Sequence, residues 1–194
     1  MDLYDSLKTI HMIGAALLFV SLGFEAVAAR RLRRAATADR ARRAFRTLRR
    51  AGRAGLAAAA VILIPGVWMM ALRWGPVSWT VTALVGIAIM AFASFRARPA
   101  LADLDATLQR ASAEVPHRVP ASLPRAVAWS LWLRASIAIG ILVLMNAKPG
   151  WVGSTTILVV GVLIGLALAM RPHRRAAPPS GGAHVPSRER QLAV

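Results

Sequence analysis

Three ionisable side chains lie inside the long apolar segments of this chain, and they are the first candidates for chemistry. His11 and Glu25 interrupt residues 9–29, and Arg134 interrupts residues 126–147. Because an ionisable group in a hydrocarbon environment is costly, each of these residues is a functional candidate that needs a partner. Their spacing along the chain decides which of them can meet.

Glu25 and Arg134 are predicted to form an ion pair. Glu25 lies about one turn from the arginine-rich end of its segment, and Arg134 lies within about two turns of the corresponding end of its own. At a similar depth in the membrane, the two side chains would neutralise each other. In the alternative, Arg134 extends to the headgroups while Glu25 sits in the interface. Whether or not the ion pair forms, we expect a purely structural role for both residues.

His11 is the other candidate, and it cannot reach Glu25. The two residues are fourteen positions apart, which places them on one helix face but roughly 21 Å apart along the axis. A lone histidine in a membrane segment can bind haem, bind a metal, relay a proton or pack as a hydrogen-bonded residue. All four roles stay open for His11.

The possible ligand sets at His11 are few. The remaining histidines fall in loops or in the tail: His117, His173 and His184. Haem held by two histidines of one chain is therefore excluded, whereas haem b with Met145 or Lys148 as the second ligand, or with an open site, stays an alternative. A copper site of His11, Met12 and Met145 is also chemically reasonable, since thioethers suit Cu(I).

Other kinds of site are excluded or have no support in the sequence. The chain has no cysteine, which excludes disulfides, thiolate metal sites, thiol nucleophiles and cysteine-held iron–sulfur clusters. It shows no phosphate-binding glycine loop, no carboxylate pair within an apolar segment and no Ser/His/Asp spacing. We therefore predict no catalytic residue and favour a protein that is not an enzyme.

The elements that must position these residues are membrane-spanning helices. The chain is 57% hydrophobic, and about 20 apolar residues suffice to cross a hydrocarbon core of about 30 Å. Five segments meet this condition: residues 9–29, 54–72, 77–95, 126–147 and 151–170. The predicted fold is an all-α polytopic bundle within residues 1–171, followed by a disordered cytoplasmic tail, residues 172–194, that is poor in large apolar side chains.

Arginine placement predicts the orientation of the bundle. Residues 30–53 carry eleven arginines, residues 96–125 carry five, and the tail after Met170 carries five more. The opposite connections hold only Lys8, Arg73 and Lys148. Because basic loops stay in the cytoplasm, we expect the N-terminus outside and the C-terminus inside a bacterial inner membrane.

The arginine-rich loops predict a contact with the bilayer surface. In residues 30–53, Ala41, Phe45 and Leu48 recur at helical spacing among the arginines, which is typical of a basic amphipathic helix on anionic headgroups. Residues 96–125 repeat the pattern more weakly. Nucleic acid is not expected as a partner, since few aromatics are interleaved and topology already explains the charge. A homo-oligomer stays open.

Several short motifs resemble a family of small bacterial integral membrane proteins of unknown function. Residues 7–15 read LKTIHMIGA, like the Leu-Lys-x-x-His-x-x-Gly that opens the first span in that family. Residues 65–68, PGVW, resemble its Gly-x-Trp, Trp79 begins the third span, and residues 144–150, LMNAKPG, resemble its Met-x-x-Lys-Pro. The resemblance covers residues 3–150.

That family is in turn distantly similar to D-type copper-resistance permeases and to the haem-dependent membrane protoporphyrinogen oxidase. The resemblance implies His11 as a haem ligand, but residues 77–95 lack the third-span histidine of the oxidase, which argues against that reaction. We therefore interpret the chain as an integral inner-membrane protein that is not an enzyme. The alternatives are a b-type haem oxidoreductase that uses His11 as axial ligand, and a copper or small-solute transporter.

Overall fold

The computed structural model describes residues 2–114 and 123–170, and the regular elements in these residues are all helices. In chain order they are α1 (Leu3–Arg33), α2 (Ala38–Met69), the π-helical turn η1 (Met70–Trp74), α3 (Ser78–Arg96), α4 (Arg98–Glu114), α5 (Arg125–Ala147) and α6 (Trp151–Met170). The predicted all-α fold is confirmed for this part of the chain. The predicted disordered tail, residues 172–194, lies outside it, as do His117, His173 and His184.

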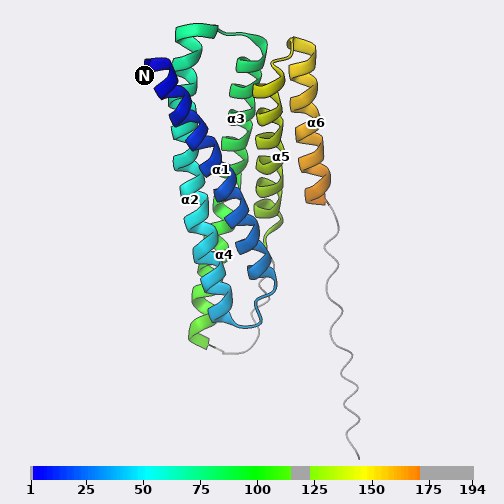
Figure 1. Ribbon diagram of the computed structural model, residues 1–194. Coiled ribbons are helices and arrows are strands. Elements are labelled where there is room, and N and C mark those ends of the chain that lie inside the picture. The colour runs from blue at the N-terminus through cyan, green and yellow to red at the C-terminus, as the bar shows by residue number, and fades with distance from the viewer. Residues whose placement is uncertain (1, 115–122, 171–194) are drawn as a thin grey trace, which may run out of the picture.

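Five of the described helices are long and apolar enough to cross a membrane. They are Leu3–Arg33, Ala38–Trp74, Ser78–Arg110, Arg125–Ala147 and Trp151–Met170. Each predicted apolar segment falls on one of these helices. The α1–α2 connection and α4 lie at one end of the bundle, and the N-terminus, η1 and the α5–α6 turn lie at the other (Figure 1).

Local signals set where the helices begin and end. The side chain of Thr37 caps α2 by accepting a hydrogen bond from the backbone N–H of Arg40. Gly75, with φ of 64°, ends η1 in a conformation that glycine adopts without strain. Between α5 and α6, Pro149 and Gly150 break the helical run. The chain therefore reverses sharply at both of these connections.

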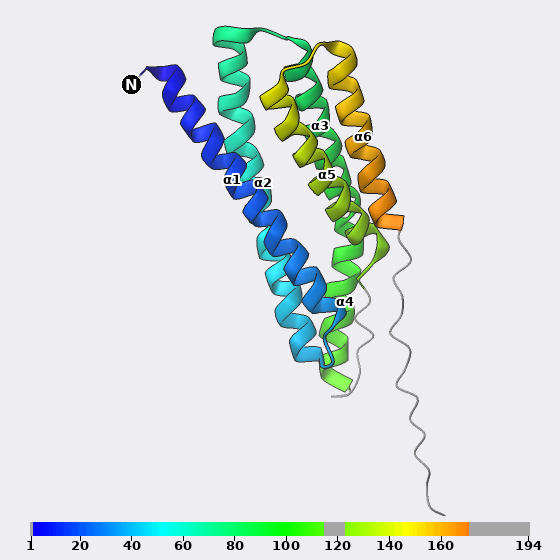
Figure 2. The ribbon, with the colours of Figure 1, turned by 45° about the vertical axis from the view of Figure 1, so that its right-hand side comes forward.

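Helix α2 is much longer than a membrane span. Its 32 residues extend for about 48 Å, against about 30 Å for the hydrocarbon core. The first half of α2 packs against the end of α1 and against α4 (Figure 2). Phe45 and Leu48 of α2, Leu32 of α1, and Leu104 and Leu108 of α4 are buried together in this small three-helix bundle.

This bundle corrects the prediction that the apolar side chains of residues 30–53 lie on the bilayer surface. Ala41, Phe45 and Leu48 are buried inside the protein, between α1 and α4. The physical reason is that amphipathic segments cover one another: the apolar stripe of α2 packs against the end of α1 and against α4. The arginines of α2 remain on the outside of the bundle, where they were expected.

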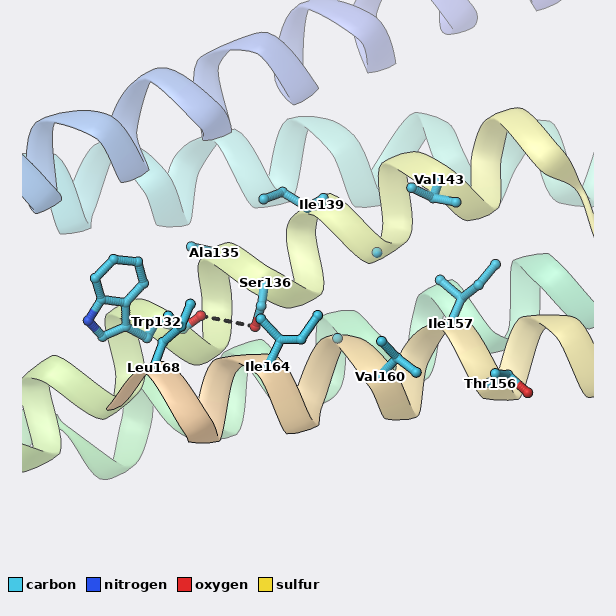
Figure 3. Close-up of a pocket in the computed structure, with 12 residues that line it drawn as sticks. Trp132, Ala135, Ser136, Ile139, Val143, Thr156, Ile157, Val160, Ile164 and Leu168 are labelled. Atoms are coloured by element: carbon cyan, nitrogen blue, oxygen red, sulfur yellow. Dashed lines mark hydrogen bonds between the residues drawn. The ribbon is translucent and has the colours of Figure 1, made fainter. Parts of the chain in front are cut away.

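Small residues let α5 and α6 approach closely. Ser136 on α5 lies against Gly161 and Gly165 on α6, and Gly140 on α5 lies against Ile157 on α6 (Figure 3). A Cβ built on Gly165 would collide with the Ser136 hydroxyl and come within 2.8 Å of the Cα of Leu133. Since lipid tails are as apolar as leucine, close packing between such small residues is what holds membrane helices together.

Gly165→Val is therefore expected to lower the free energy of unfolding by about 1–3 kcal/mol, because the new side chain has no room between the helices. The measurement is unfolding of the purified protein in mixed detergent micelles. Gly23→Val is the matched control, since a Cβ on Gly23 meets no described atom within 4 Å. Equal stability of the two variants would contradict the close α5–α6 contact.

Candidate functional site

Glu25 and Arg134 form a bidentate ion pair that joins α1 to α5. The Nη1 of Arg134 donates to Oε1 of Glu25 at 3.1 Å, and Nη2 makes a second contact with Oε2. The Nε of Arg134 donates to the backbone carbonyl of Ser130 at 3.2 Å. The Glu25 residue is only 3% exposed. This two-bond geometry is the strongest arrangement available to a carboxylate and a guanidinium.

Helix α2 leaves room for the carboxylate through two glycines. A Cβ built on Gly55 would lie 3.5 Å from Oε1 of Glu25, and one built on Gly52 would lie 3.9 Å from it. Any longer side chain at either position would compete with the carboxylate for this space. The ion pair therefore sits where α1, α2 and α5 meet.

Removing one partner of this ion pair should be much worse than removing both. Glu25→Gln or Arg134→Gln leaves the other charge buried alone, so each should lower the free energy of unfolding by about 3 kcal/mol or more. The double variant should lose clearly less than the sum of the two. Unfolding in mixed micelles measures all three, and additive losses would show that the two side chains are not coupled.

His11 is held in a single orientation between α1 and α2. Its Nδ1 lies 2.9 Å from the backbone carbonyl oxygen of Ile62. Because a carbonyl only accepts, Nδ1 must carry the proton in this hydrogen bond, which leaves the lone pair of a neutral ring on Nε2. The ring also lies against Gly66, where a Cβ would come within 3.1 Å of its Cε1 and Nδ1.

Pro65 lies on α2 within one turn of the carbonyl that His11 contacts. Proline has no N–H, so the helix loses the bond that residue 65 would donate to the carbonyl of Val61. In membrane helices, polar side chains from a neighbouring helix commonly compensate such loosened turns. His11 bonds to the next carbonyl, that of Ile62, and Gly14 brings α1 close enough for this contact.

Lys148 lies in an aromatic cluster at the end of the bundle that holds the N-terminus. Its ammonium is 4.6 Å from the ring centroid of Trp74 and 5.9 Å from that of Trp79. The two indoles meet edge to face at 5.7 Å. Trp74 also donates from Nε1 to the Tyr4 hydroxyl at 3.1 Å, and Arg73 stacks over the Tyr4 ring. We call these five residues the aromatic cluster.

The aromatic cluster bears on the predicted ligand set. The structure gives Lys148 the two indoles as partners and gives His11 the carbonyl of Ile62. Met145 is half-buried on α5, and no group of three or more His, Cys, Asp or Glu residues in residues 2–114 and 123–170 could hold a metal. A haem or copper site that combines His11 with Met145 or Lys148 stays a prediction.

The turn after α5 places Lys148 in an unusual backbone conformation. Lys148 is the single non-glycine residue with positive φ among those described, at φ 45° and ψ 50°. The next carbonyl, that of Pro149, accepts hydrogen bonds from the hydroxyls of Ser78 and Ser154 at 2.9 and 3.0 Å. These bonds tie the turn to α3 and α6, so the strained conformation is held from both sides.

Lys148→Ala should therefore be less stable than Lys148→Gly. Both variants lose the contact with the indoles. Only alanine has a Cβ that makes the left-handed conformation unfavourable, by about 1 kcal/mol of folding free energy. The measurement is the midpoint of unfolding in mixed micelles. If alanine proved as stable as glycine, the backbone conformation assigned to this turn would be wrong.

Sequence reasoning missed the residues that make room for the site. Gly52, Gly55 and Gly66 matter because they have no side chain, which leaves room for Glu25 and His11. The sequence of an apolar helix does not indicate which neighbour each glycine faces. Tyr4 and Arg73 were also missed as partners. The signal available was the presence of two cations, Arg73 and Lys148, next to tryptophans at one end of the predicted bundle.

Comparisons with protein-family models, with curated proteins and with solved structures found no match to this chain. The resemblance of the short motifs to a family of bacterial integral membrane proteins therefore stays a prediction.

Proposed function

We propose that this chain is a non-enzymatic integral protein of the bacterial inner membrane, with its N-terminus outside. In this proposal the arginine-rich end of the bundle binds the anionic headgroups of the cytoplasmic leaflet. The observation that carries it is the packed three-helix bundle at that end, which fixes arginines at defined distances from the buried ion pair. The proposal concerns binding and anchoring, with no reaction.

The ion pair sets the depth of the nearest arginines. Glu25 lies beside Gly55, so Arg53 and Arg50 stand about 3 and 8 Å beyond the carboxylate along α2. On α1, Arg30 stands about 8 Å beyond it in the same direction. These three exposed arginines lie at similar depth on the outside of the bundle. We call them the proximal arginines.

Other arginines stand too far out to touch headgroups. Arg40, Arg43 and Arg46 are also exposed, but they lie about 14–22 Å beyond Gly55 along α2. The polar layer on each side of a bilayer is only about 5–8 Å thick. We call these three the distal arginines. They still favour a cytoplasmic location, because the field of an anionic surface extends over a Debye length of about 8 Å.

The sharpest test compares two variants of equal charge. The proximal variant Arg30→Gln/Arg50→Gln/Arg53→Gln should lose most of the extra stability that anionic over zwitterionic lipid gives the protein, about 1 kcal/mol per arginine. The distal variant Arg40→Gln/Arg43→Gln/Arg46→Gln should keep most of it. Thermal unfolding in nanodiscs with and without phosphatidylglycerol measures both. Equal losses in the two variants would contradict headgroup binding at the proximal arginines.

A second candidate function is favoured by one observation, the fixed ring of His11. With Nδ1 bonded to the carbonyl of Ile62, Nε2 has the lone pair that an axial ligand of haem b requires. Haem would supply one-electron transfer. His11 would supply one axial ligand, while Lys148 lies against the two indoles of the aromatic cluster.

The haem candidate is settled by the colour of the protein purified from haem-replete cells. A Soret band that disappears in His11→Ala would favour haem binding, and a colourless protein would exclude it. Copper or small-solute transport requires a polar pathway. The groove that the structure shows between α5 and α6 is apolar, so it gives that alternative no support.

A further inference from the structure

The three distal arginines, Arg40, Arg43 and Arg46, form one exposed basic face on the first half of α2. They recur every third residue, so their Cα atoms lie about 4.5 Å apart along the helix axis and within about 120° around it. The middle one, Arg43, is turned by about 140–160° from Phe45 and Leu48, which are buried against α1 and α4. The distal arginines therefore face away from the bundle, on the side of α2 that a partner can reach.

The positive charge of this face is not neutralised within the described residues. The acids nearest to it pair with other arginines of α2: Arg42 donates to Asp39 at 2.7 Å, and Arg49 donates to Asp105 at 3.0 Å. Within residues 2–114 and 123–170, no ion pair involves the side chain of a distal arginine. Since like charges one turn apart on a helix repel each other, an anionic partner would stabilise this part of α2.

Three kinds of anionic or copy-derived partner meet obstacles at this face. Lipid headgroups lie out of reach, because the distal arginines stand about 14–22 Å beyond Gly55 along α2. A second copy of the chain carries the same net charge of +17 and would be repelled. The one aromatic residue in residues 38–53 is Phe45, which is buried, so nucleic-acid bases find no ring to stack on. An acidic peptide meets none of these obstacles, and arginine binds carboxylates with paired hydrogen bonds.

The spacing of the distal arginines matches that of acidic residues on a helix. Glutamates three or four residues apart on one helix face lie about 4.5–6 Å apart along the axis, close to the interval between the arginines. Phe45 and Leu48 hold this half of α2 in the three-helix bundle, so the three guanidinium groups project from a helix that is already ordered. Binding therefore costs little backbone entropy on the side of this protein.

We propose that the distal arginines bind an acidic helix of a cytosolic protein, laid along α2 with its carboxylates facing Arg40, Arg43 and Arg46. This surface lies beyond the headgroups, so it adds a protein-binding role to the anchoring role proposed for the membrane surface. The inference rests on the proposed cytoplasmic location of this end of the bundle. It does not depend on headgroup binding at the proximal arginines.

The experiment compares two synthetic peptides of the same composition and of about 20 residues, long enough to form a helix. In the first peptide, glutamates recur every third or fourth residue on one helix face, and in the second the same glutamates are spread evenly around the helix. Binding to the full-length protein in phosphatidylcholine nanodiscs is measured by fluorescence anisotropy of the labelled peptide. This zwitterionic lipid keeps anionic headgroups from competing. We expect the first peptide to bind about tenfold more tightly than the second.

The distal variant, in which glutamine replaces all three distal arginines, should bind the first peptide about tenfold more weakly than wild type, because three exposed ion pairs are lost. Glutamine is a good helix former and the three positions are exposed, so the fold should persist, which circular dichroism checks. Should this variant fail to fold, Arg43→Gln alone takes its place, with an expected loss of about twofold.

Arg96→Gln/Arg110→Gln/Arg125→Gln is the matched control, because it removes the same charge from exposed arginines of α3, α4 and α5. It should bind the first peptide as wild type does. Equal binding of the two peptides, or equal losses in the distal and control variants, would overturn the proposal, since net charge alone would then attract the peptide. So would a single-stranded oligonucleotide that binds more tightly than the first peptide and is lost in the distal variant. Headgroup binding has its own readout in the proximal variant, so the two proposals can fail separately.

Discussion

The buried ion pair between Glu25 and Arg134 is the interaction on which the arrangement of α1, α2 and α5 depends, because a charge buried in an apolar bundle needs a partner of opposite charge. The carboxylate of Glu25 lies among apolar helices, and the guanidinium of Arg134 meets it with two bonds. Separating α1 from α5 would leave two unpaired charges in a medium that solvates neither. The pair therefore fixes the register of α1 against α5 and, through Gly55, the height at which α2 passes both helices.

The two ends of the bundle are held by different chemistry. At the arginine-rich end, α1, α2 and α4 bury Phe45, Leu104 and Leu108 as a water-soluble helical bundle would. At the other end, the aromatic cluster links the start of α1, η1 and the α5–α6 turn through Lys148 and the two indoles. Between the ends, glycine and serine residues let α5 and α6 approach closely, which is the kind of packing that associates helices in lipid.

The sequence predicts some of these features well because their signals are strong. Apolar length alone locates the five long helices, and charge at matching depth selects Glu25 and Arg134 out of all acidic and basic residues. Other features have no distinguishable signal. The stripe of Ala41, Phe45 and Leu48 looks the same whether lipid or protein covers it. Gly52, Gly55 and Gly140 leave room for atoms of a neighbouring helix because they have no side chain. The sequence does not specify which helix that is.

The meeting of α1 and α2 beside the ion pair can be tested directly, because the chain has no cysteine of its own. A Cβ at Gly55 would lie 3.5 Å from the Cβ of Ser21, which is within the range for a disulfide. In Ser21→Cys/Gly55→Cys, mild oxidation in native membranes should therefore form a disulfide. Neither cysteine should then react with maleimide. Gly23→Cys/Gly55→Cys, with one cysteine turned away from α2, should keep both thiols free. Free thiols in the first pair, or equal oxidation of the two pairs, would contradict the α1–α2 contact beside the ion pair on which this account depends.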